Sequence, residues 1–66
     1  MDIEALKKQI ALRGYNVVNF SDAVKIDRST FYRRLSGNGC SFTIEEVKRM
    51  KDVLNLDEDS AAKIFL

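Results

Sequence analysis

The sequence has no histidine, no proline and no tryptophan, and it contains a single cysteine among 66 residues. One cysteine cannot form a disulfide within the chain, and a metal site is not expected without histidine. The same shortage removes the usual pairs of nucleophile and base, so we expect neither an enzyme nor a cofactor site. The cysteine, Cys40, lies in the loop GNGCS, and we expect it to have no chemical role.

Long hydrophobic runs are also missing. No apolar stretch approaches the length of a membrane span, and the start, MDIEALKKQI, lacks the apolar run of a secretion signal. We therefore expect a cytoplasmic protein that makes no use of a membrane. An apolar fraction of 45% with 32% charged residues is ordinary for a globular chain. Without a linker or an internal repeat, residues 1–66 are predicted to form one domain.

Positive charge is unevenly distributed along the chain. Residues 1–36 carry seven Lys and Arg against four Asp and Glu, a net of +3, and residues 37–66 carry four against six, a net of −2. The two sums give the overall +1. The segment IDRSTFYRRLSG, residues 26–37, alone holds three arginines. Such a split gives one surface a positive field although the protein as a whole is almost neutral.

Apolar spacing and capping residues predict an all-α fold of five helices. No apolar run alternates with period two, and the helical pattern predicts segments of about 3–13, 17–24, 28–36, 44–54 and 58–65. Start signals for these segments are Asp2, Asn16, Asp27, the capping-box pair Thr43 and Glu46, and the acidic run from Asp57. Gly14 and Gly37 are placed to end the first and third segments.

The same spacing predicts the buried side chains. The inward residues are expected to be Phe20 and Val24, then Phe31 and Leu35, then Ile44, Val47, Met50 and Leu54, with Leu56 in the following turn. The ending Ile64, Phe65, Leu66 has two interpretations. These residues either cover the core, or one of them is exposed and pairs two subunits.

The basic segment 28–36 is predicted to present a polar outer face. Arg33 falls nearly opposite Phe31 and Leu35, whereas Arg34 falls at the rim of the buried face. The positions that flank Arg33 hold Ser29, Tyr32 and Ser36. Guanidinium, phenol and hydroxyl groups suit hydrogen bonds to base edges and phosphates. Solvated charges on an amphipathic helix are the other interpretation, and these residues alone leave it open.

Arg28 adds a second indication. A cation in the first turn of a helix opposes the helix dipole, at a cost of roughly 0.3 to 1 kcal/mol. An anionic partner explains an arginine at this position better than folding does. The segment before it, with Phe20 and Val24 inward and a turn at Lys25, predicts two short helices joined by a tight turn.

The run NVVNFSDAVKIDRSTFYRRLSG, residues 16–37, resembles the helix-turn-helix of the phage repressor and Cro family, of the xenobiotic-response-element type. The matching features are a small residue after the inward aromatic one, an apolar residue in the turn, a Ser-Thr pair before a buried residue and a closing glycine; here these are Ser21, Ile26, Ser29 with Thr30, and Gly37. The likeness continues through TIEEVKRMKDVLNL to KIFL and is greatest for small phage-encoded regulators of low-GC Gram-positive bacteria. It implies a lambda-repressor-like domain.

The resemblance also implies a function, that of a sequence-specific DNA-binding transcriptional regulator acting on a double-stranded operator. Carried over by position, base contact falls to Arg28, Ser29, Tyr32 and Arg33, and phosphate contact falls to Lys25, Ser36 and Asn38. One such domain covers half a site, so a homodimer is the usual DNA-binding form. Two departures weaken the match, namely Lys25 where glycine is common and Val17 where a phosphate-contacting glutamine is common.

Binding to a protein is the alternative. Small phage proteins of this fold can also bind a phage repressor, and the basic segment could dock on an acidic surface of such a protein. A net charge of +1 favours this alternative, because nonspecific DNA affinity depends on phosphate neutralisation. Tyr32 suits either partner, since tyrosine is frequent at the centre of protein interfaces.

Overall fold

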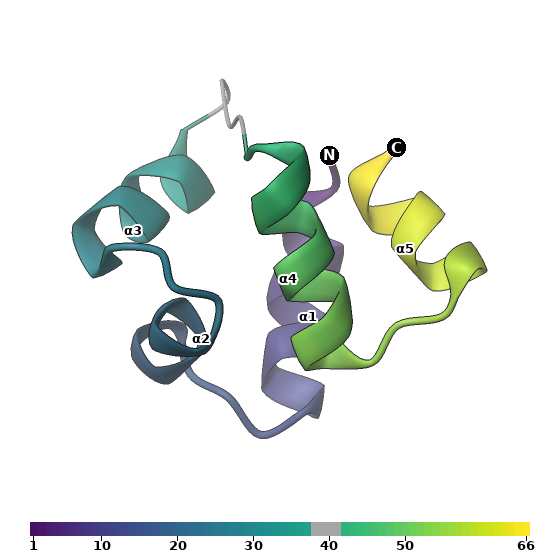
Figure 1. The fold of residues 1–66 in the computed structure, drawn as a ribbon, viewed down its shortest axis with the longest axis horizontal. Coiled ribbons are helices and arrows are strands. Elements are labelled where there is room, and N and C mark those ends of the chain that lie inside the picture. Colours follow the sequence, from purple (N-terminus) through teal and green to yellow (C-terminus); the bar gives the residue numbers. More distant parts are fainter. Residues whose placement is uncertain (38–41) are drawn as a thin grey trace.

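The fold is all-α, as predicted. The computed structural model describes residues 1–37 and 42–66, and these residues form five helices and no strand. The helices are α1 (Ile3–Leu12), α2 (Val17–Ala23), α3 (Arg28–Ser36), α4 (Ile44–Leu54) and α5 (Glu58–Phe65). In Figure 1, α2 and α3 lie on one side of α1 and α4, and α5 lies on the other. The predicted helix boundaries are confirmed to within one residue.

Every helix begins at the N-cap that the sequence predicts. In each case a side-chain oxygen accepts a hydrogen bond from the backbone N–H three residues later, and the caps are Asp2, Asn16, Asp27, Thr43 and Asp57. Glu46 completes the predicted capping box, because its carboxylate accepts from the Thr43 N–H at 2.8 Å. These bonds satisfy N–H groups that a helix leaves without an intrahelical partner.

The core lies where the helices converge, and most of its predicted members are confirmed. Phe20, Val24, Phe31, Met50 and Leu54 are fully buried. A row of aromatic rings runs through the core, formed by Tyr15, Phe20, Phe31 and Phe42, with successive ring centroids 5.5, 5.7 and 5.7 Å apart. Tilted and edge-on pairs at such distances add to the stabilisation that burial gives. The core therefore joins the α2–α3 pair to the start of α4.

Ile44 is where the predicted core is wrong. Its side chain is 78% exposed, although it shares helical spacing with Met50 and Leu54. Ile44 is the first residue of α4, and along this helix the first apolar residue that is even half-buried is Val47. Helical spacing shows which residues share a face, but it does not show how far the neighbouring helices extend along that face.

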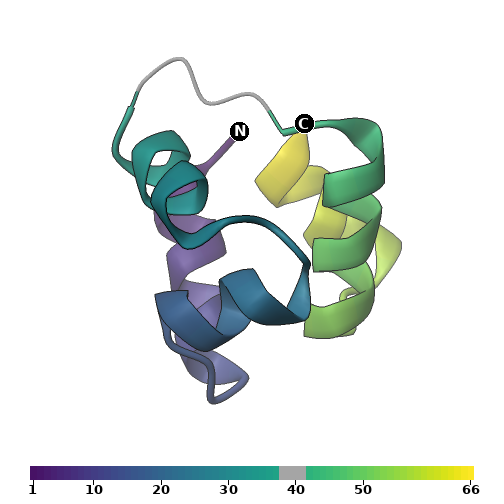
Figure 2. The same ribbon diagram turned by 60° about the vertical axis from the view of Figure 1, so that its left-hand side comes forward.

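The last three residues differ in burial, so some cover the core and one is exposed. Ile64 is 3% exposed and belongs to the core, and its carbonyl accepts a 2.7 Å hydrogen bond from the Asp2 N–H. Phe65 is half-buried, and Leu66 is 98% exposed. Figure 2 shows this end of α5 beside the start of α4. The ending thus both covers the core and exposes an apolar side chain.

Candidate nucleic-acid interface

A tight turn holds α2 against α3. Lys25 has φ 60°, in the left-handed region, and its N–H donates to the Asp22 carbonyl at 3.2 Å. Ile26 is buried, and its N–H donates to the carbonyl of the fully buried Ser21 at 3.0 Å. A left-handed lysine costs roughly 1 kcal/mol, so the surrounding contacts must hold it there. The turn therefore sets the angle at which α3 leaves α2.

The outward side of α3 carries the residues for which base contact was predicted. Phe31 and Leu35 are buried, and Ser29, Tyr32 and Arg33 are exposed; we call these three the α3 outer face. Of these, Tyr32 is 53% exposed. Arg33 has no ion-pair partner within residues 1–37 and 42–66. The predicted orientation of α3 is confirmed, and its outer face is available to a partner.

Arg28 finds an anionic partner inside the chain. Its Nη2 lies 2.9 Å from Oδ2 of Asp22, and its Nε donates to Oδ1 at 3.4 Å. Both side chains remain more than half exposed, at 59% and 56%. The hydrogen bond from Arg28 and its charge lower the pKa of Asp22 below 3.8, so the carboxylate is charged at neutral pH. The pair offsets the unfavourable position of Arg28 at the positive end of the α3 dipole.

Arg34 fastens the other end of α3 to α4. Its Nη1 lies 2.8 Å from Oε1 of Glu46, and its guanidinium lies 5.4 Å from the centroid of the Phe42 ring. Both charged side chains are largely buried, at 27% and 15% exposure. Burial raises the pKa of Glu46, but the hydrogen bonds from Thr43 and the charge of Arg34 outweigh it and leave that pKa lowered. Arg34 lies at the rim of the buried face, as predicted.

The residues predicted to contact phosphate are only partly described. Lys25 and Ser36 are exposed, at the two ends of the stretch that contains α3. The Ser36 hydroxyl donates back into its own helix, to the Tyr32 carbonyl at 3.0 Å, and keeps its oxygen as an acceptor. Asn38 lies outside the described residues, as does Cys40. Val17 is half-buried and cannot supply the phosphate contact of a glutamine.

Sequence reasoning missed three residues that hold the α2–α3 pair in place. These are Asp22 and Glu46, which pair with Arg28 and Arg34, and Arg49, whose Nε donates to the Val24 carbonyl at 2.7 Å. Arg49 thereby caps the end of α2 from α4. Only the Asp22 pair could have been predicted from the sequence, because an acid in the last turn of α2 is followed, after one tight turn, by a base in the first turn of α3. The other two contacts depend on how α4 crosses the pair, which local spacing does not predict.

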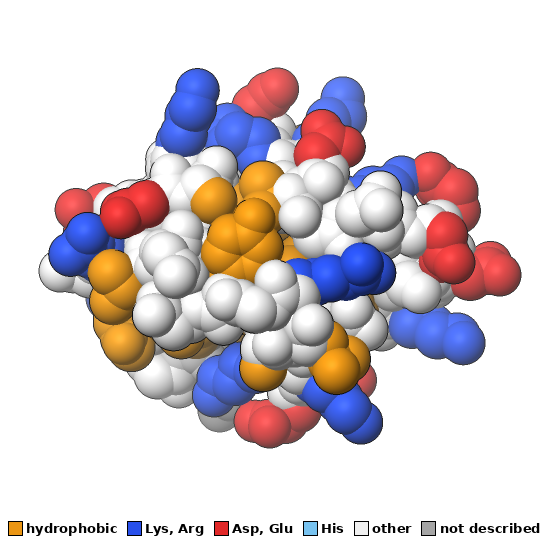
Figure 3. All heavy atoms as spheres, turned by 90° about the horizontal axis from the view of Figure 1, so that it is seen from below, with side chains coloured by type: hydrophobic (Ala, Val, Ile, Leu, Met, Phe, Trp, Pro, Cys, Tyr) orange, Lys and Arg blue, Asp and Glu red, His pale blue; other side chains and the backbone are white. Residues whose placement is uncertain are grey.

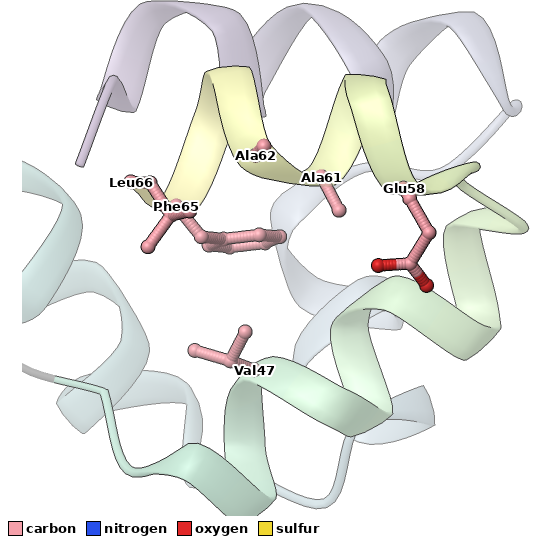
Figure 4. Close-up of a pocket in the computed structure, with 6 residues that line it drawn as sticks. All are labelled: Val47, Glu58, Ala61, Ala62, Phe65 and Leu66. Atoms are coloured by element: carbon pink, nitrogen blue, oxygen red, sulfur yellow. The ribbon is translucent and has the colours of Figure 1, made fainter.

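A second surface lies between α4 and α5. A hollow of about 210 Å³ is lined by Val47, Glu58, Ala61, Ala62, Phe65 and Leu66. Figure 4 shows the Phe65 ring and the Val47 side chain facing each other across it. One of the residues that line this α4–α5 hollow, Leu66, is 98% exposed; Ile44, one turn before Val47 on α4, is a second exposed apolar residue. In Figure 1, α5 lies on the other side of α1 and α4 from α3.

The face of the molecule that Figure 3 shows carries charges of both signs. In Figure 3, Lys and Arg side chains are mixed with Asp and Glu around its edge, and apolar side chains lie at its centre and at its left and lower edges. Across the described ranges, no three His, Cys, Asp or Glu side chains are grouped so as to hold a metal ion. Nor do these ranges contain a helix with the length and hydropathy needed to cross a membrane.

Comparison of the chain with protein-family models, with curated proteins and with solved structures finds no match. What the α3 outer face binds is therefore inferred from its own residues, their exposure and the contacts that hold them.

Proposed function

We propose that this chain is a sequence-specific DNA-binding transcriptional regulator of phage repressor and Cro type, acting in the cytoplasm of a bacterial host. In this proposal α2, the Lys25 turn and α3 form a helix-turn-helix, and α3 enters the major groove of a double-stranded operator. The observation that carries the proposal is the α3 outer face, where Arg33 is exposed nearly opposite the buried Phe31 and Leu35, and the exposed Ser29 and Tyr32 flank it.

The contacts that hold α3 in place favour recognition of a rigid partner. Arg28 ties the start of α3 to Asp22 of α2, and Arg34 ties its far end to Glu46 of α4. A helix held at both ends keeps its outer face in one orientation, which lowers the ordering cost of binding. Major-groove recognition needs this, because base edges present donors and acceptors in fixed positions.

Phosphate contacts fall beside the outer face rather than on it. The exposed Lys25 extends from the turn, and Ser36 lies at the end of α3. Such contacts set the register of the helix on the duplex without reading sequence. In the sequence, residues 16–37 hold four Lys and Arg against two Asp, a net of +2, so the attraction to DNA is local and moderate.

A second copy of the chain is the proposed occupant of the α4–α5 hollow. Leu66 lines the hollow and is 98% exposed, so two copies related by a twofold axis can each supply both the cavity and the side chain that fills it. No residue of α3 lines this hollow, so an interface there leaves both outer faces uncovered. Such a dimer reads two half-sites about one helical turn apart, so selected sites should be inverted repeats.

The experiment selects bound fragments from a random duplex pool and then titrates the selected site. Arg33→Ala is expected to weaken binding by about 1 to 3 kcal/mol, the usual worth of a bidentate base contact. Lys63→Ala, which removes the same charge from α5, is the matched control and should change affinity little. Melting temperatures of both variants should stay close to that of the wild type, since both side chains are exposed.

The outcome separates DNA from a protein partner. If the pool shows no enrichment and a long random duplex does not bind even at low salt, the DNA proposal is wrong. The α3 outer face should then be tested against a phage repressor, the alternative that the net charge of +1 favours. Asymmetric selected sites, together with a monomer mass in solution at all concentrations, would contradict the proposed dimer.

A further inference from the structure

The Asp22–Arg28 pair leaves one edge of the arginine open. Both hydrogen bonds to Asp22 come from the edge formed by Nε and Nη2. A guanidinium has five N–H donors in a planar fork, so three remain, two on Nη1 and one on Nη2. These three have no acceptor within residues 1–37 and 42–66, and the Arg28 side chain is 59% exposed. The terminal fork of Arg28 is therefore oriented and available.

That fork has the geometry of a guanine contact. In the major groove, guanine presents N7 and O6 side by side, and the two terminal nitrogens of an arginine donate to them together. Arg28 is the first residue of α3, and the residues near the start of a recognition helix are those that reach base edges. Without Asp22, the long side chain would have to be ordered at the moment of binding, which lowers the gain from the contact.

The pair is poorly suited to a phosphate. A carboxylate 2.9 Å from Nη2 offsets most of the charge that would attract the DNA backbone, and it repels phosphate oxygens directly. Directed hydrogen bonds to a base are less sensitive to this loss of net charge. Exposed ion pairs add little to stability, so the main effect of this pair is on the orientation of Arg28 and not on the free energy of unfolding.

We propose that Asp22 is a positioning residue that holds Arg28 so that its terminal fork reads a guanine in the bound site. The inference depends on the proposed DNA-binding function and adds a base and a supporting residue to it. It predicts opposite effects of removing the Asp22 charge, because the same carboxylate orients Arg28 and repels the backbone. Specific preference should fall while affinity for arbitrary sequence rises.

The experiment compares the wild type with Asp22→Asn, Arg28→Ala and the control Asp59→Asn, which removes an acid from α5 and changes net charge equally. Each protein is titrated against the selected site, the site with each guanine in turn replaced by 7-deazaguanine, which lacks N7, and a random duplex. For the wild type, one such replacement per half-site should weaken binding measurably, by less than the roughly 5- to 150-fold that loss of a whole bidentate contact costs, because O6 remains. Arg28→Ala should abolish that difference. Asp22→Asn should reduce it several-fold and strengthen random-duplex binding, whereas Asp59→Asn should leave the difference intact.

Each other outcome has a definite meaning. If Asp22→Asn keeps the full guanine preference, or strengthens selected and random duplexes equally, Asp22 acts only through charge and the inference is wrong. If the selected site contains no guanine whose replacement depends on Arg28, the inference is wrong although DNA binding stands. If no duplex binds the wild type at low salt, the proposed function fails, and the inference fails with it. A large fall in the melting temperature of Asp22→Asn would show a structural role instead.

Discussion

Replacing Phe31 with alanine tests whether the orientation of α3 depends on its buried ring. Phe31 is fully buried and packs between Phe20 and Phe42, with both ring centroids 5.7 Å from its own. Truncating a buried phenylalanine costs about 3 to 5 kcal/mol. At 0.05 to 0.15 kcal/mol per residue, a chain of 66 residues has a total free energy of unfolding of roughly 3 to 10 kcal/mol.

The loss is thus comparable with the whole stability of the domain. For a domain of this size, each kcal/mol lowers the melting temperature by about 4 to 8 °C, so the expected fall is roughly 12 to 40 °C. The assay is thermal and urea unfolding followed by far-ultraviolet circular dichroism. Tyr32→Ala, one residue along the same helix but 53% exposed, is the control and should cost less than about 1 kcal/mol. A cooperative Phe31→Ala melt within a few degrees of the wild type would refute the packing argument.

Two further predictions concern the ends of α3. The lowered pKa of Glu46 means that its contribution to stability is fully present above the unfolded value of 4.5 and is lost as pH falls through the lower folded value. Glu46→Gln should therefore lose less stability than the wild type over that acid range in urea titrations, and equal losses would show that folding does not lower the pKa of Glu46. Lys25→Gly should relieve the left-handed strain, for a net gain of up to about 1 kcal/mol after the entropy cost of glycine. The same change should weaken DNA binding and lower the salt slope by about 0.9 per subunit, so unchanged DNA affinity would remove Lys25 from the phosphate contacts.

The fold was predictable to the extent that it depends on local chemistry. Caps such as Asn16 and Thr43 act within one turn of the chain, so the sequence predicts where α2 and α4 begin. The left-handed Asn55 that ends α4, at φ 53°, was not predicted, because asparagine is compatible with this conformation without requiring it. The prediction that Ile44 is buried was wrong for a related reason, because its exposure depends on where α5 and the rest of the fold stop covering α4.

The candidate site was less predictable than the fold, because its electrostatics depend on helix crossing angles. The sequence shows three arginines in the α3 segment but not which of them have acids beside them. Glu46 lies 12 positions from Arg34, beyond any spacing rule for helix surfaces, and the pair forms only because α4 returns past the end of α3. A count of basic residues therefore overestimates the positive charge that a partner would meet.

The three arginines of α3 divide into two kinds, and this division bears on how the segment binds. Arg28 and Arg34 are paired with Asp22 and Glu46. Much of their charge is therefore neutralised within the chain, and the two pairs hold α3 to its neighbours. Arg33 is exposed and has no acidic partner among the described residues. Its place in the last turn of α3 suits the negative end of the helix dipole, which explains a cation there but not its direction away from the core. Positive charge gathered for long-range attraction would not be neutralised at two positions out of three. The pattern instead favours a surface whose affinity depends on a few oriented donors, which is what discrimination between base pairs requires.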